Sequence, residues 1–380
     1  MAYTFHIVDS RTGIKQLEVF PSSGSWSRVL NAGGKGTHTF VLTADQAMRD
    51  RVLSTPWSRT LVVSWDGVAV YAGLIVRRVY SQDDNTLTVS HEDFRSLLQR
   101  RYPFGVNSYT QDGTTATGAG WLTLTALTLR AIVVRVLQEG LVGPFPIYSM
   151  PVFINSNAIA STPLAAESGG YSRTYENFAF LTVEQIIDNV QDEEGGPDTD
   201  FEPVWVDGVF QWNARIGSPS TPKLYSTAPG GNPFEFNMGA EQRVLTGVTV
   251  TDDGAKQATG VFSIGEGSGR DMKLAGNGFG SSATIPALDV AESFKDEKSY
   301  DILFSYSNGA LPVRGKTTTQ YELGMLATEI PGLSALRIGV LFRLIWSGNP
   351  WVADGNVDLR VISLSGSMTN DLTIDVQPWG

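Results

Sequence analysis

Few side chains in this sequence have the chemistry and spacing of a catalytic or metal-binding site. The 380-residue chain contains three histidines, His6, His38 and His91, and no cysteine. None of the histidines lies in an HExxH spacing, and without thiolates a transition metal would depend on these imidazoles and on carboxylates. We interpret them as strand or cap histidines and expect no metal site.

Two glycine-containing segments resemble nucleotide-binding loops but miss the required spacing. Residues 309–317 read GALPVRGKT, and the first glycine lies one residue too far from the GK pair for a phosphate-binding loop. Residues 265–269 read GEGSG, which differs from the GxGxxG pattern of dinucleotide-binding folds. We interpret both as loops. With no GxSxG nucleophile elbow either, we expect no cofactor, no catalytic residue and no enzyme activity.

The acidic segment 192–202, DEEGGPDTDFE, has the oxygen ligands that calcium prefers. Asp198 and Asp200 fit the first ligands of a calcium loop. The glycine and the distal glutamate that would complete an EF-hand are missing. We therefore interpret this segment as a solvated turn.

Nine tryptophans are a second unusual feature of the composition. Trp205 and Trp212 fall on the two arms of one predicted hairpin, and Trp346 and Trp351 flank the turn GNP at residues 348–350. Exposed indoles stack on sugars, whereas buried ones anchor cores or subunit interfaces. We favour the buried interpretation.

The charge of the chain argues against nucleic-acid and membrane surfaces. It carries 28 Lys and Arg against 39 Asp and Glu, a net charge of −11. A nucleic-acid-binding face requires a basic patch, but an acidic surface can line a passage for DNA because like charges prevent adhesion. We expect no signal peptide, no transmembrane helix and no stable membrane insertion, since no apolar run approaches the necessary length.

The elements of the N-terminal region predict a small β-barrel closed by a helix. The clearest stretch, residues 61–101, reads as a meander with a hairpin turn at Asp66-Gly67 and an irregularity at Gly73, followed by a helix with the apolar residues Phe94, Leu97 and Leu98. We assign residues 1–102 to this domain.

The remaining sequence predicts a mixed middle domain, 103–240, and a second barrel-like domain, 241–380. In the middle domain, apolar spacing predicts helices over 129–137 and 182–190. A hairpin follows, with strands over 201–206 and 209–216.

In the last domain we expect five strands and two short helices, the helices over 288–294 and 318–329. The whole chain is predicted to be α+β, mainly β with some α and about a fifth helix.

Four segments, taken in order, resemble the minor tail proteins of actinobacterial siphophages. They are SWSRVLNAGGKGTHTFVL (25–42), VAVYAGLIVRRVYSQDDNTLTVSHEDFRSLLQRR (68–101), LTVEQIIDNVQDEEGGPDTDFEPVWVDGVFQWNARIG (181–217) and GNVDLRVISLSGSMTNDLTIDVQPWG (355–380). Hubs of phage tails share a pattern in which a strand, a turn and a second strand precede the motif D-F-x-S-L-L-x-R-R. In this chain the motif lies at residues 93–101.

The resemblance implies a structural protein of the virion: a baseplate hub at the tail tip, assembled in the host cytoplasm. Such hubs are homotrimers with two tail-tube-like β-barrel domains per chain, so that three chains continue a sixfold tube. The implied partners are the tail tube or distal tail protein, the tape measure protein and other minor tail proteins. Genomic DNA would pass through the lumen without specific binding when the ring opens for ejection.

Within this interpretation, six residues are candidates for subunit interfaces: Arg77, Arg78, Arg100, Arg101, Trp205 and Trp212. The arginines could pair with acidic neighbours in a ring or simply face solvent. Three alternatives to the hub stay open: a distal tail protein that forms a hexameric ring, a tail-associated cell-wall hydrolase, and a glycan-binding protein.

Overall fold

The computed structural model describes residues 3–103, 121–141, 149–154, 167–225, 231–240, 244–278, 285–295 and 297–379. Strands make up 47% and helices 18% of the structure. The predicted fold class, mainly β with some α, is therefore confirmed.

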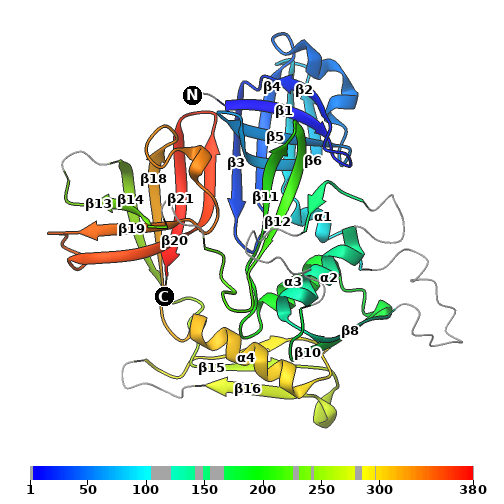
Figure 1. Cartoon of the computed structure of the whole chain (residues 1–380), viewed down its shortest axis with the longest axis vertical. Coiled ribbons are helices and arrows are strands. Elements are labelled where there is room, and N and C mark those ends of the chain that lie inside the picture. Colours follow the sequence, from blue (N-terminus) through cyan, green and yellow to red (C-terminus); the bar gives the residue numbers. More distant parts are fainter. Residues whose placement is uncertain are drawn as a thin grey trace, which may run out of the picture.

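One sheet of 13 strands forms the body of the molecule (Figure 1). Its hydrogen-bonded order is β14-β18-β21-β20-β3-β4-β7-β6-β5-β1-β2, with β13 and β19 attached beside β20. The N-terminal members are β1 (Tyr3–Asp9), β2 (Lys15–Val19), β3 (Ser23–Val29), β4 (Lys35–Val41), β5 (Arg59–Trp65), β6 (Val68–Ser81) and β7 (Thr86–Glu92). Two 3₁₀ turns, η1 (Gln46–Arg49) and η2 (Arg51–Ser54), connect β4 to β5.

The C-terminal members of the sheet lie beside the N-terminal ones because β20 pairs with β3. They are β13 (Phe234–Asn237), β14 (Leu245–Asp253), β18 (Thr318–Leu326), β19 (Leu341–Trp346), β20 (Gly355–Ser367) and β21 (Asp371–Pro378), with the 3₁₀ turn η9 (Leu333–Ala335) between β18 and β19. The β20–β3 pair is antiparallel and places Ser365 opposite Ser27. In Figure 1 it joins the orange and red strands on the left to the blue strands on the right.

A single hydrophobic cluster covers one face of both halves of this sheet. Trp26 and Phe40 contribute from β3 and β4, and Leu364, Ile374 and Leu323 contribute from β20, β21 and β18. These side chains alternate with polar ones along each strand, the period-two pattern of a sheet with one buried face. Each fully buried side chain of this size contributes roughly 1.5–3 kcal/mol, so the shared core holds the two halves together.

The middle of the chain packs against the N-terminal strands through a second cluster. Its elements are α1 (Arg95–Leu98), β8 (Trp121–Leu127), α2 (Leu129–Leu141), β9 (Val152–Phe153), β10 (Tyr171–Glu176), η7 (Asn177–Ala179), α3 (Val183–Gln191), β11 (Thr199–Val206) and β12 (Val209–Ile216). The predicted capping box is present, since Thr182 and Gln185 exchange side-chain hydrogen bonds with each other's backbone at the start of α3. The predicted β11–β12 hairpin is also present. Asp207 and Gly208 both have positive φ at its turn, as a type I′ turn requires.

A small outer unit follows, at the bottom of Figure 1, in which α4 packs on a three-stranded sheet. It consists of β15 (Gly260–Ile264), η8 (Gly269–Asp271), β16 (Leu274–Gly278), β17 (Asp289–Ser293) and α4 (Tyr300–Arg314). The loop interpretation of residues 309–317 was wrong for most of its length, because α4 continues through Pro312 to Arg314. Gly309 allows this helix to touch the acidic segment, since an added Cβ would overlap the carbonyl oxygen of Asp192.

Both short helices predicted in the last domain are strands instead. Residues 289–293 form β17, and residues 318–326 form β18. In β18, Tyr321, Leu323 and Met325 are buried while their neighbours are not, which is the alternation of a strand rather than the spacing of a helix. Tertiary pairing with β14 and β21 decides the conformation here.

Candidate functional site

The face of the sheet opposite the core carries an unusual row of small hydroxyl side chains. Strand register shows that they share one face, because residues paired across an antiparallel ladder point to the same side. Ser367 lies opposite Ser25, Ser25 opposite Thr37, and Thr37 opposite Ser90. We call this surface the Ser/Thr face; its residues are Ser25, Ser27, Thr37, Thr39, Thr88, Ser90, Ser363, Ser365, Ser367 and Thr373.

The side of the sheet that carries the Ser/Thr face continues to both ends of an eight-stranded part of the sheet. Toward β14 it becomes acidic, since Asp375 lies opposite Ser363 and Glu322 lies opposite Asp375. Toward β6 it becomes basic, since Arg77 lies opposite Ser90. A shallow open cavity of about 680 Å³ hollows its middle, where β20 meets β3.

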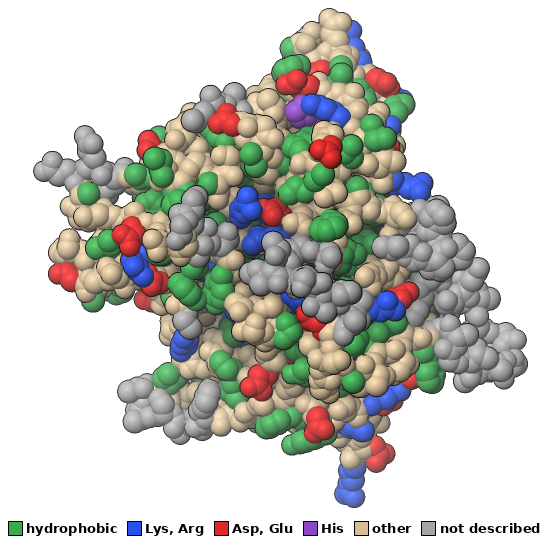
Figure 2. All heavy atoms as spheres, viewed as in Figure 1, with side chains coloured by type: hydrophobic (Ala, Val, Ile, Leu, Met, Phe, Trp, Pro, Cys, Tyr) green, Lys and Arg blue, Asp and Glu red, His purple; other side chains and the backbone are tan. Residues whose placement is uncertain are grey.

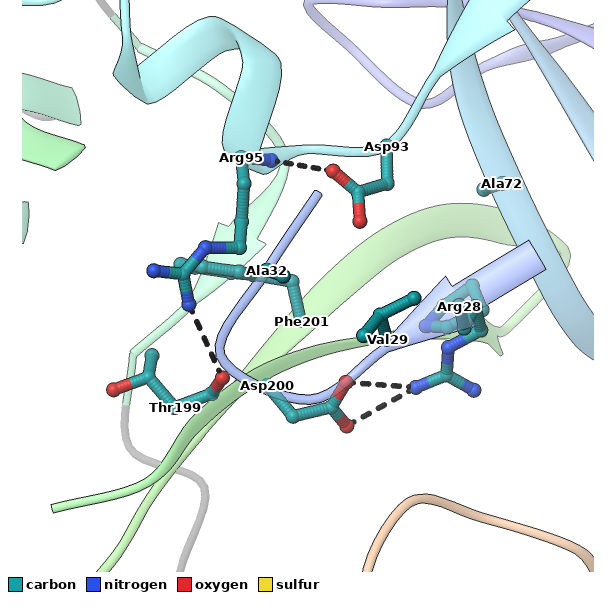
Figure 3. Close-up of a pocket in the computed structure, with 10 residues that line it drawn as sticks. Arg28, Val29, Ala32, Ala72, Asp93, Arg95, Thr199, Asp200 and Phe201 are labelled. Atoms are coloured by element: carbon teal, nitrogen blue, oxygen red, sulfur yellow. Dashed lines mark hydrogen bonds and ion pairs between the residues drawn. The ribbon is translucent and has the colours of Figure 1, made fainter. Parts of the chain in front are cut away.

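The acidic segment 192–202 is not a solvated turn, as the sequence suggested, but the centre of a buried ionic network. Asp198 is 1% exposed and Asp200 is 6% exposed. Asp200 accepts hydrogen bonds from Arg28 of β3 at 3.0 and 3.1 Å, as Figure 3 shows. It also accepts one from Arg215 of β12 at 3.2 Å. Arg215 also donates to the carbonyl oxygen of Ile338 at 2.9 Å, so the network reaches the C-terminal half.

Asp198 joins the same two halves of the sheet. Its carboxylate pairs with Arg360 of β20 and accepts a hydrogen bond from Asn31, which follows β3, at 2.8 Å. Burial alone would raise the pKa of Asp198, but Arg360, Lys223 and the hydrogen bonds from Asn31 and the Leu224 amide outweigh it and hold the pKa below its usual value. Asp198 therefore stays ionised between the N-terminal and C-terminal strands.

A fourth buried arginine extends the network to the helices. Arg95 of α1 is 2% exposed and binds Glu184 at 2.5 Å and Asp188 at 2.9 Å, both on α3. Its guanidinium also donates to the carbonyl oxygen of Thr199 at 3.4 Å, as Figure 3 shows. Burial raises the pKa of Glu184 to about 6, although Arg95 opposes the shift.

We call this set of residues the ionic junction: Arg28, Asn31, Arg95, Glu184, Asp188, Asp198, Asp200, Arg215 and Arg360. In the view of Figure 2, Lys and Arg side chains gather beside acidic ones between the two halves of the sheet. The guanidinium groups occupy the carboxylate oxygens that a calcium ion would need. In the described ranges no group of three or more metal-ligating side chains comes together. The junction connects β3, β20 and the helices through buried ion pairs.

Sequence reasoning missed the arginines of the ionic junction, although one signal marks Arg28. It stands in phase with the buried residues Trp26 and Leu30. A charged residue at an inward strand position is rarely fully buried without a partner. An arginine in such phase therefore predicts a buried carboxylate elsewhere in the chain.

The structure separates the predicted interface arginines into two pairs. Arg77 is exposed on β6, and Arg78 beside it is half-buried and donates to the carbonyl oxygen of Arg51 and to Ser54 Oγ. Neither has an ion pair within the described part of the chain. These two side chains stay candidates for an intersubunit contact.

The other pair lies after α1. Arg100 is exposed and stacks its guanidinium 4.9 Å from the ring centre of Trp57, and Arg101 is half-buried. The carbonyl oxygen of Arg101 accepts a hydrogen bond from the Val183 amide. This segment is engaged in holding α1 beside α3.

The two candidate tryptophans make contacts inside the chain. Trp212 is 1% exposed and packs on Phe94 and Phe210, so its ring is unavailable to a neighbouring subunit in this conformation. Trp205 is half-buried and donates from Nε1 to Ser64 Oγ at 3.0 Å. Both attach the β11–β12 hairpin to the N-terminal strands, which agrees with the buried interpretation. Trp346 on β19 is buried as well, but Trp351 is 79% exposed, so the buried interpretation was wrong for that residue.

The prediction that the histidines are strand residues is confirmed, and the side chains of two of them are in contact. His38 Nδ1 lies 2.8 Å from His91 Nε2, and His91 Nδ1 lies 2.8 Å from the hydroxyl of Tyr71. All three side chains are at most 1% exposed. Burial lowers the pKa of His38 to about 4, and burial together with His38 lowers the pKa of His91 well below its usual value. Both imidazoles are therefore neutral at pH 7.

No family model and no curated protein sequence matches the chain. Solved structures do share its fold. The tail protein from Neisseria meningitidis MC58 superposes with a TM-score of 0.57 at 10% identity, over 99% of this chain and 97% of its own. The 43 kDa tail protein of prophage MuSo2 from Shewanella oneidensis gives 0.56 at 11% identity, over 99% and 98%.

A third similar structure is the Francisella PdpA–VgrG complex, with a TM-score of 0.51 at 8% identity, over 99% of this chain but 52% of that chain. The chain therefore has the fold of phage tail proteins, and it has that fold over nearly its whole length. Within the described residues, no helix is long and apolar enough to cross a membrane.

Proposed function

We propose that this protein is a structural baseplate hub at the tip of a phage tail. Three copies would form a ring that continues the tail tube, closes it around the tape measure protein and opens for DNA ejection. The shared fold with tail proteins supports the class, and the resemblance of the sequence to actinobacterial siphophage proteins supports the place in the virion. No catalytic step is part of this proposal.

The observation that carries the proposal is the Ser/Thr face. A sheet face that only needs to be solvated usually carries long charged side chains, whereas this one presents small hydroxyls over four neighbouring strands. Short neutral side chains predominate on this face, and Lys35, Glu92 and Asp371 are the charged residues beside its central cavity. The carboxylates of Glu322 and Asp375 at its acidic end would repel a polyanion and keep DNA from adhering. We infer that this face lines the passage.

The strand count supports three copies. The part of the sheet that bears the Ser/Thr face has two groups of four strands, β14-β18-β21-β20 and β3-β4-β7-β6. Three chains would supply six such groups, which matches a sixfold tube with threefold symmetry. In this proposal the division at residues 102 and 240 separates the two tube-like barrel domains from the middle domain.

The remaining surfaces would serve the partners. The rims of the ring would contact the tail tube or distal tail protein on one side and other minor tail proteins on the other. The outer unit lies at the bottom of Figure 1, beyond the 13-stranded sheet, and would stand outside the tube in this scheme. DNA passes without specific binding in this scheme.

Light scattering on the purified protein at several concentrations tests the ring directly. A mass of three chains supports the hub. A mass of six chains would favour a distal tail ring instead. A monomer at every concentration, combined with absence from virions, would contradict the tail proposal and favour the hydrolase or glycan-binding alternatives.

A further inference from the structure

The two ends of the eight-stranded part of the sheet are free edges. β14 is the last strand at one end, and within the described residues it pairs with β18 alone. At the other end, β6 pairs with β5 only as far as Leu74, while its residues 77–81 pair with β7 alone in the described part of the chain. An exposed edge presents unpaired backbone groups and is a ready template for another strand.

Strand direction allows these two edges to join. Every neighbouring pair from β14 through β6 is antiparallel, and the number of strands in this series is even. β14 and β6 therefore run in opposite directions. When copies are related by rotation about a ring axis, β14 of one copy would meet β6 of the next as one more antiparallel pair.

The charges at the two edges are opposite and lie at matching positions. β14 ends with the exposed pair Asp252 and Asp253, and the free segment of β6 begins with Arg77 and Arg78. An antiparallel pair brings the end of one strand against the beginning of the other. No ion pair within the described residues engages any of these four side chains.

The register that sets Asp253 opposite Arg77 also preserves the faces of the sheet. Asp253 and Arg77 both belong to the side of the Ser/Thr face, because Asp253 alternates with Thr251 and Thr249 while Arg77 pairs with Ser90. One residue along, Asp252 would lie opposite Arg78 on the core side. A one-residue slip would exchange the faces, so this register is strongly specified.

A groove beside β6 fits the core-side residues of an incoming β14. The groove has a cavity of about 620 Å³ with buried Leu42, Met48 and Leu87 among its lining residues. Arg51 and Arg78 lie beside this apolar surface. On β14 the matching side carries half-buried Val248 and Val250 followed by Asp252, an apolar pair with a carboxylate at the end.

We propose that β14 of one copy adds to residues 77–81 of β6 in the next copy, with Asp252 and Asp253 paired to Arg78 and Arg77. The occupant of this edge is thus a second copy of the chain, and repetition around the axis closes the sheet without free edges. This joint rests on the proposed ring and names the residues that form it.

Charge reversal tests the joint. R77E/R78E and D252K/D253K each place like charges opposite one another, and we expect assembly to weaken roughly 100-fold or more in each variant. The combined variant, R77E/R78E/D252K/D253K, restores complementary charges and should recover the wild-type mass. R270E/K295E makes the same charge change as R77E/R78E at exposed sites of the outer unit and should assemble normally.

Light scattering gives the mass of each variant, and circular dichroism verifies that each is folded. Loss of the trimer in both edge variants with recovery in the combined variant supports the joint. A trimeric wild type whose edge variants remain trimeric overturns the joint but leaves the ring intact. Loss without recovery in the combined variant overturns the pairing of these four residues. A monomeric wild type overturns the ring itself.

Discussion

Asp200→Asn is the sharpest test of the ionic junction, because it removes one charge that two buried arginines share. The amide oxygen that remains at position 200 can still accept a hydrogen bond, but Arg28 would lose its carboxylate partner and keep otherwise only the carbonyl oxygen of Val70 at 3.4 Å. Arg215 would keep the carbonyl oxygen of Ile338 and a contact of 4.0 Å with Glu202. Removal of one partner from a buried ion pair typically costs about 3–5 kcal/mol. We expect a loss of about that size in the free energy of unfolding.

Denaturant unfolding followed by tryptophan fluorescence measures this loss. Asp358→Asn is the matched control, because Asp358 pairs with Arg343 at 2.6 Å near the surface, where water screens the charge. The control should lose much less stability. The triple variant R28M/D200N/R215M removes all three charges and should recover most of the loss, since apolar replacement of a buried ion pair is often nearly neutral.

Equal losses for Asp200→Asn and Asp358→Asn would refute the reasoning, because they would show that burial of the pair adds nothing. A triple variant as unstable as Asp200→Asn would refute it as well. The cost would then come from lost packing or hydrogen bonds rather than from an uncompensated buried charge.

Three further predictions follow from the fold and the Ser/Thr face. In the unfolded chain His38 takes up a proton below its ordinary pKa of 6.5, whereas in the folded chain it does so only near its lowered pKa of about 4. The stability that the folded chain gains by keeping His38 neutral is therefore complete above pH 6.5 and is lost as the pH falls toward 4. Urea unfolding at a series of pH values should show this loss of stability. The free energy of unfolding should fall less steeply with decreasing pH in His38→Asn than in the wild type, and an equal pH dependence in both would contradict the prediction. Gly309→Val should lower the thermal midpoint strongly, because its side chain would overlap the backbone of Asp192, while Gly254→Val at an open surface turn should change it little. Ser365→Trp should leave the circular dichroism and the trimer unchanged while it reduces DNA ejection from assembled virions, and normal ejection would contradict the lining role of the Ser/Thr face.

The sequence allowed local structure to be predicted wherever neighbouring residues decide it. The capping box at Thr182 and Gln185 and the turn at Asp207-Gly208 were both predictable, because each depends on residues within one turn of chain. β18 was predicted as a helix because its pairing with β14 and β21 involves residues that lie far away in the chain.

The ionic junction was beyond local reasoning for the same physical reason. Arg28 and Asp200 are separated by 172 positions, and Asp198 and Arg360 by 162. An acidic segment with no nearby cation is expected to be solvated, and only the folded chain brings the guanidinium groups to it. The Ser/Thr face is a different case. Its alternation is visible in each strand, but strand order is needed to place those residues on one surface.

Electron microscopy of the purified assembly tests the central claim most directly. The account predicts three copies around one axis, with Ser27, Thr37, Ser90 and Ser365 facing an open passage and the outer unit at the periphery. A ring of another copy number, or one with the Ser/Thr face on its outer surface, would contradict the account.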